Sequence, residues 1–152
     1  MNEVRFNLTE NTERISKLLR LGKAVDQTIF VFTSNMEGDH AKGASLEALT
    51  NWGAVLGSPV GRQGLSYAIP AKSHRKHLMP ITGIWPYTVD FIRYAELHPE
   101  LLFKVSRIGC SPSGYRDSEM APMFRNAPSN CYFDTNWHPT LGDSYNYWGH
   151  HA

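Results

Sequence analysis

The chain has few of the features that mark specialised protein classes. Only two of its 152 residues are cysteines, Cys110 and Cys131, too few for a disulfide framework or a four-thiolate metal site. Its 15 lysines and arginines nearly balance its 14 aspartates and glutamates, so a broad basic face for extended DNA or RNA is not expected. No apolar run reaches the length needed to span a membrane. These absences predict a soluble domain with no membrane or nucleic-acid partner.

The length and composition favour one compact domain over residues 1–152. Hydrophobic residues make up 41% of the chain, which argues against disorder. No N-terminal stretch combines basic residues, an apolar core and a small-residue cleavage site, so we expect a cytoplasmic protein. Residues 1–26 are expected to add an edge strand over 2–8 and a helix that ends near Leu21, and residues 132–152 to form an aromatic C-terminal tail.

The most informative stretch runs from Ile29 to Ala44 and reads IFVFTSNMEGDHAKGA. Its first four residues are β-branched or aromatic without interruption, which is typical of a central strand covered on both faces. Polar residues and two glycines then predict a loop that leads into a helix. First-turn amides of such a helix form an anion site, which His40 or Lys42 can supplement. An ordinary strand-loop-helix connection explains these residues equally well.

Strands and helices alternate along the rest of the chain. Apolar residues alternate from Leu65 to Ile69, which predicts a second strand that ends at Pro70 and presents Lys72 at its edge. A helix is expected over Thr88 to Leu97. A third strand, roughly Leu102 to Ile108, leads into a second glycine-bearing loop and another helix. This alternation predicts an α/β fold with a mainly parallel sheet, whose two glycine-bearing loops lie on one rim and can enclose a diphosphate.

Three segments together carry a resemblance to a known family: FVFTSN-MEGDHAKGA, SYAIPAK and RIGC-SPSGY. They resemble a largely uncharacterised phage and prophage family with a FVFGSNxxGxHGxGAA opening. That family is similar to macro domains, especially the branch that removes ADP-ribose from glutamate. The resemblance covers about Phe30 to Cys131. It implies a three-layer α/β/α macro-like sandwich, with a mixed and mainly parallel sheet, that binds ADP-ribose or a related signalling nucleotide.

The resemblance also implies where the ligand would bind. It places Asn35 beside the distal ribose, the first phosphate loop at His40 to Ala44 and the second at Gly109 to Tyr115. Lys72 aligns with the lysine that the ADP-ribosyl-glutamate hydrolases use as a nucleophile. The ligand-binding residues expected on this basis are Ser34, Asn35, His40, Lys42, Gly43, Ala44, Gly109, Ser111, Ser113, Gly114 and Tyr115.

Two departures from the family pattern bear on the expected site, the first on the space at the strand end and the second on catalysis. Thr33 stands where the phage family usually has glycine, and Ser113 stands where the hydrolases carry their catalytic aspartate. A serine cannot perform the acid-base task of a carboxylate. Asp117 and Glu119 lie nearby in the sequence and are the candidates to replace it. Lys72 is then either a nucleophile or a lysine that faces phosphate or solvent.

Three functions stay open at this point. The leading hypothesis is a module that binds an ADP-ribose-type or cyclic nucleotide and, if phage-encoded, sequesters a defence signal in the host cytoplasm. The alternatives are an ADP-ribosyl hydrolase or signal-degrading enzyme that uses Lys72, and a protein-interaction module with a vestigial pocket. No cofactor or metal is expected. His74 and His77 have a spacing that can share a metal, but no carboxylate or thiolate accompanies them at a suitable spacing. The oligomeric state does not follow from the sequence.

Overall fold

The computed structural model describes residues 27–74 and 77–150. The strands are β1 (Gln27–Asn35), β2 (Gly61–Gln63), β3 (Ser66–His74), β4 (His77–Leu78), β5 (Leu101–Val105), β6 (Cys131–Asp134) and β7 (Asn146–Gly149). The helices are α2 (Gly43–Asn51), α3 (Ile81–Leu97), α4 (Asp117–Met120) and α5 (His138–Leu141), with 3-10 turns η1 (Ala121–Phe124) and η2 (Thr135–Trp137). The strand and helix expected before residue 22 lie outside the described residues.

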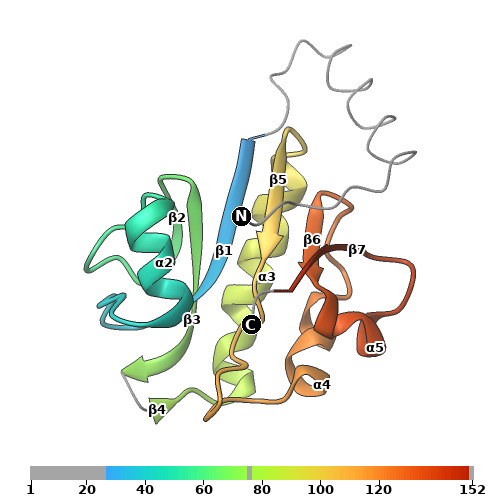
Figure 1. Ribbon diagram of the computed structural model, residues 1–152. Helices are drawn as coiled ribbons and strands as arrows, with labels where there is room; N and C mark the ends of the chain where they lie inside the picture. The colour runs from blue at the N-terminus through green and yellow to red at the C-terminus, as the bar shows by residue number, and fades with distance from the viewer. Residues whose placement is uncertain (1–26, 75–76, 151–152) are drawn as a thin grey trace.

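All of these strands belong to one mixed sheet (Figure 1). The strand order is β2-β3-β1-β5-β6-β7, and β4 pairs with β3. β1 runs parallel to β3 and to β5, and β5, β6 and β7 continue in parallel. The short strands β2 and β4 are antiparallel to β3. The mainly parallel sheet predicted from the sequence is confirmed, and the carboxyl ends of β3, β1, β5 and β6 therefore share one rim.

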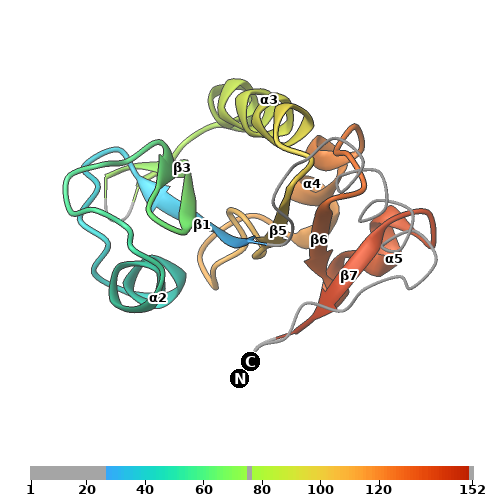
Figure 2. The same cartoon turned by 90° about the horizontal axis from the view of Figure 1, so that it is seen from above.

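Helices cover both faces of the sheet, which gives the expected three layers (Figure 2). One face packs against α3, α4, η1, η2 and α5. The opposite face carries α2 over β1 and β3. We call these the α3 face and the α2 face. No helix within residues 27–74 and 77–150 is long and apolar enough to cross a lipid bilayer.

The uninterrupted apolar run of β1 follows from this burial on both faces. Ile29 and Val31 join the large core on the α3 face, whereas Phe30 and Phe32 pack on the α2 face with Ala48. Because successive strand residues point to opposite faces, a strand with two buried faces needs apolar residues at every position. The central strand predicted from the sequence is confirmed.

Two boundaries expected near the rim differ from the structure. β3 continues through Pro70 as far as His74. The register between β3 and β1 shifts just beyond the pair of Ser34 and Pro70. Pro70 has no N–H to donate, and an irregularity in the ladder accommodates such a residue. β5 ends at Val105, three residues early, because the N–H of Ile108 bonds back to the carbonyl of Ser106 at 2.8 Å and turns the chain.

The main helix begins earlier than its sequence pattern predicts. α3 begins at Ile81 rather than Thr88 and runs through Pro86, a residue that normally interrupts a helix. The buried side chain of Ile84 lies in its first turn and packs into the core of the α3 face. Tertiary packing thus holds the first turns in place despite the proline.

The C-terminal segment is part of the sheet and not a separate tail. Residues 131–134 form β6 and residues 146–149 form β7. Trp137 is fully buried in the core of the α3 face. The indole of Trp148 donates a hydrogen bond to the carbonyl of Val105 at 2.9 Å. Over residues 132–150 the expected aromatic tail is therefore replaced by strands and short helices, in which Tyr132, Phe133, Trp137 and Trp148 are buried and Tyr145 and Tyr147 pack against the core.

Candidate functional site

The chain leaves β1 and its two neighbours in opposite directions at the carboxyl rim of the sheet, so the end of β1 is a topological switch point. β1 continues through a first loop (residues 36–42) to α2, on the α2 face. β3 leads to α3, and β5 leads through a second loop (residues 106–116) to α4, both on the α3 face. Ligands of open α/β sheets bind at such switch points, beyond the carboxyl ends of the strands.

A hydrogen bond joins the second loop to the end of β1. The N–H of Gly109 donates to Oγ1 of Thr33 at 3.0 Å. Gly109 has a φ of +74°, and an added Cβ there would lie 2.7 Å from Cε of Met120. The second loop is therefore fixed to the end of the strand that leads into the first loop, through a side-chain oxygen that a glycine at position 33 would lack.

The N-terminus of α2 has open hydrogen-bond donors. Its N-cap, Lys42, makes no capping bond, and its first turn contains no acidic residue. The N–H groups of Gly43, Ala44 and Ser45 have no acceptor among the described residues. An added Cβ at Gly43 would meet nothing within 4 Å. Three open amides at the positive end of a helix form a site that attracts an anion.

His40 lies buried under the first loop. It is 1% exposed, and its φ of +43° is unusual for a residue other than glycine. Its ring meets Phe32 edge to face, with 5.2 Å between the ring centroids. Neither ring nitrogen has a hydrogen-bond partner in the part of the chain that the structure describes. A buried polar group without a partner is costly, so both ring nitrogens have unused hydrogen-bonding capacity, although the closed loop shields them from solvent.

The second loop is a tight turn with two open amides. The N–H of Tyr115 donates to the carbonyl of Gly109 at 2.8 Å, and the N–H of Gly114 donates to that of Ser111 at 2.8 Å. The N–H groups of Ser111 and Ser113 have no acceptor within residues 27–74 and 77–150. The hydroxyl of Tyr115 donates to the carbonyl of Met79 at 2.7 Å. Tyr115 thus anchors the loop to the start of α3.

Two polar residues at the end of β1 bond within the protein. Oδ1 of Asn35 accepts hydrogen bonds from the N–H groups of Glu37 and Gly38 at 3.1 and 2.9 Å, and Nδ2 donates to Asp39 at 3.0 Å. Ser34 is 4% exposed, and its hydroxyl donates to the carbonyl of Pro59. Asn35 thus shapes the first loop, and Ser34 ties the end of β1 to the segment before β2. The expected contact of both side chains with a ligand stays a prediction.

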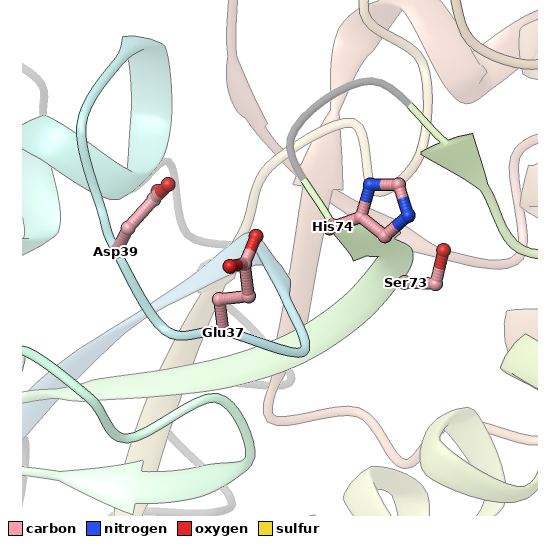
Figure 3. Close-up of a pocket in the computed structure, with 4 residues that line it drawn as sticks. All are labelled: Glu37, Asp39, Ser73 and His74. Carbon is pink, nitrogen blue, oxygen red and sulfur yellow. The ribbon is translucent and has the colours of Figure 1, made fainter.

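Lys72 lies at the rim and pairs with Asn35 across the β1–β3 ladder. Beside it, a cleft of about 620 Å³ opens between the first loop and the end of β3. Figure 3 shows Glu37 and Asp39 on the loop side, and Ser73 and His74 on the β3 side. The two carboxylates disfavour phosphate here. A phosphate group therefore fits the N-terminus of α2 better than this cleft.

Asp117 is held by three hydrogen bonds directly after the second loop. It accepts hydrogen bonds from Nε and Nη2 of Arg107 at 2.8 Å each, and from the indole N–H of Trp137 at 2.8 Å. Burial acts to raise the pKa of Asp117, but the bonds from Arg107 and Trp137 outweigh it and hold the pKa below its ordinary value. Asp117 is thus a stable anion that links α4 to η2. Glu119 accepts from the N–H of Arg116 at 3.0 Å and caps α4.

Replacement of Asp117 by asparagine is expected to lower the free energy of unfolding by about 2 kcal/mol at pH 7, because the amide turns a donor toward Arg107. The folded pKa of Asp117 lies below 3.8, so its stabilisation is complete above that value and is lost as the pH falls through the folded pKa. Urea unfolding should show that the difference in unfolding free energy between the parent and Asp117→Asn is smaller at pH 3 than at pH 7. Asp143→Asn, at a side chain 95% exposed, is the control and should change little.

Comparison with known proteins gives no match: no family model, no curated protein and no solved structure matches this chain. The resemblance to macro domains therefore depends on the three motifs alone. The α/β/α architecture agrees with it, but many unrelated functions share such folds.

Proposed function

We propose that the switch point at the end of β1 binds ADP-ribose or a related signalling nucleotide through its diphosphate. The observation that carries this proposal is that two loops with open amides follow the neighbouring strands β1 and β5 at one switch point, with the second loop tied to the end of β1 by the bond from Gly109 to Thr33. Open backbone amides suit phosphate oxygens because they donate hydrogen bonds to the anion, and no charged side chain has to lose its hydration to do so.

The first phosphate is assigned to the N-terminus of α2. The amides of Gly43, Ala44 and Ser45 supply donors there, and the unpartnered ring of His40 lies in the loop that precedes them. The second phosphate is assigned to the open amides of Ser111 and Ser113. Amides that already point toward the ligand replace the hydrogen bonds that water made to its phosphates. The protein does not have to change conformation to do this, which favours tight binding.

Sequestration is the biological role proposed for this site. A small binder that holds a nucleotide signal lowers its free concentration, and this role suits the phage family that the motifs resemble. Lys72 lies next to Asn35 at the rim, beside the acidic cleft, and is assigned neither of the two phosphates.

Isothermal titration calorimetry with ADP-ribose tests the proposal. The full chain should bind one equivalent, and Ser45→Asp should weaken binding at least tenfold, about 1.4 kcal/mol, by placing a negative charge among the open amides. The same substitution supports the helix dipole, so the variant should fold as well as the parent.

Thr50→Asp, near the opposite end of α2, is the matched control and should bind as the parent does. The same titration with cyclic ADP-ribose isomers and cyclic dinucleotides identifies the preferred ligand. The absence of heat and of thermal shift with every one of these nucleotides would refute the proposal and favour a protein-interaction module.

A further inference from the structure

The α2 face continues over β5, β6 and β7, where it carries an apolar cluster of its own. Lys104 of β5 pairs with Phe30 of β1 on one side and with Tyr132 of β6 on the other. Residues aligned in a parallel ladder point to the same face, so Lys104 and Tyr132 share the α2 face with Phe30. The ring of Trp148 in β7 lies 4.5 Å from Nζ of Lys104 and clusters with Leu102 and Tyr132. We call this surface the β7 half of the α2 face.

The side chains of the β7 half are as buried as those of the core. Leu102 and Lys104 are each 1% exposed, Tyr132 is 2% exposed and Trp148 is 5% exposed. Within the described part of the chain, however, their apolar cluster consists of strand residues alone. Figure 2 shows α2 over β1 and β3, and none of the labelled helices on this side of β6 and β7. Large side chains on an uncovered sheet face stay accessible to water, so another segment must cover the β7 half.

Three segments lie outside residues 27–74 and 77–150, and one of them is long enough to be that cover. Residues 75–76 join β3 to β4, and these strands are on the far side of β1 from β6 and β7. Residues 151–152 are too few to cover three strands. The remaining segment is residues 1–26.

We propose that residues 1–26 pack against the β7 half as a structural part of the domain. The sequence predicts a helix that ends near Leu21, in which Ile15, Leu18 and Leu19 form one apolar stripe. This stripe needs an apolar surface to pack against, and the β7 half needs a cover. The occupant of the β7 half is thus the N-terminal segment of the same chain and not a second protein.

The length of the segment permits this contact. Gln27, the first residue of β1, pairs with Leu101, the first residue of β5. Residues 22–26 span up to about 17 Å when extended, so a helix that ends near Leu21 can reach β5 and the strands beyond it. A helix from Asn11 to Leu21 is about 16 Å long, whereas β5 and β7 are about 10 Å apart at the usual strand spacing. One helix therefore suffices to cover the three strands.

Fluorine NMR of the full chain labelled with 5-fluorotryptophan tests the contact, with the signal of Trp148 assigned by Trp148→Phe. Leu18→Asp should shift this signal and increase its response to replacement of H2O by D2O, because a charge on the stripe loosens the cover. The signal of Trp137, in the core of the α3 face, should stay in place. Ser16→Asp makes the same change of charge beside the stripe and should leave both signals unchanged. A Trp148 signal that does not respond to Leu18→Asp would overturn the proposal.

Photo-cross-linking gives a second readout that needs no destabilised variant. A full chain with p-benzoylphenylalanine in place of Leu18 should form cross-links within one chain to β5, β6 or β7, identified by mass spectrometry of the monomeric product. Cross-links to α3, or between two chains, would refute the proposal, and the latter would assign the β7 half to a second copy. Neither readout uses a nucleotide, so both are independent of the calorimetric test of ADP-ribose binding.

Discussion

Replacement of Gly114 by alanine is expected to disrupt the second loop and to lower the free energy of unfolding by about 2–3 kcal/mol. An added Cβ at this position would lie 2.2 Å from the carbonyl oxygen of Gly109. That oxygen is the acceptor for Tyr115 and cannot move without breaking the turn. Because the open amides of Ser111 and Ser113 belong to the same turn, ADP-ribose binding should be lost as well.

Gly57→Ala separates this steric effect from ordinary backbone strain. Gly57 has a φ of +83°, but an added Cβ there would meet nothing within 4 Å. Gly57→Ala should therefore lower the free energy of unfolding by only about 1 kcal/mol and leave ligand binding intact. Urea unfolding and calorimetry on both variants make the comparison. Normal binding by a folded Gly114→Ala protein would show that the second loop does not contact the ligand.

Replacement of Lys104 by methionine is expected to stabilise the protein by about 1–3 kcal/mol at pH 7. Lys104 is 1% exposed within β5, and its Nζ has no hydrogen-bond partner among the described residues. Its contacts are aromatic rings, of which Trp148 is nearest at 4.5 Å. Cation-π attraction offsets only part of the cost of burying the charge. Methionine fills the same volume without that cost.

The pH dependence of this effect has a definite sign. Burial lowers the pKa of Lys104 below 10.5, against the opposing charge of Glu47. Between the folded pKa and 10.5, the unfolded chain binds the proton and the folded protein does not, so stability rises with pH in that window. The parent should therefore approach the stability of Lys104→Met as the pH rises toward 10.5. Thermal unfolding from pH 6 to pH 10 measures this, with Lys42→Met as the exposed control. A constant difference across that range would contradict a lowered pKa.

The parts of the fold that the sequence predicts well are those with local signals. The strand at Ile29 and the helix after Gly43 were correct because continuous apolar residues and a glycine boundary specify them independently of distant contacts. β6 and β7 carry no comparable signal. The segment Cys131 to Asp134 is too short to show a pattern, and the residue of β5 that pairs with Cys131, Phe103, lies 28 residues earlier in the chain.

The candidate site divides in the same way. Both glycine-bearing loops follow strands that are recognisable from their residues, so the amides of Ser111 and of Gly43 could be predicted. The bonds that hold Asp117 could not, because Arg107 and Trp137 are 10 and 20 residues distant from it.

The sequence by itself determined the fold class and the two loops, because strand and helix periodicity and glycine positions are local properties of the chain. The tertiary structure decided which side chains are available for chemistry. It ties Asp117 to Arg107, leaves His40 without a hydrogen-bond partner among the described residues, and sets Lys104 against aromatic rings. Burial and long-range hydrogen bonds, which arise only when strands far apart in the sequence pair, control the reactivity of a polar group.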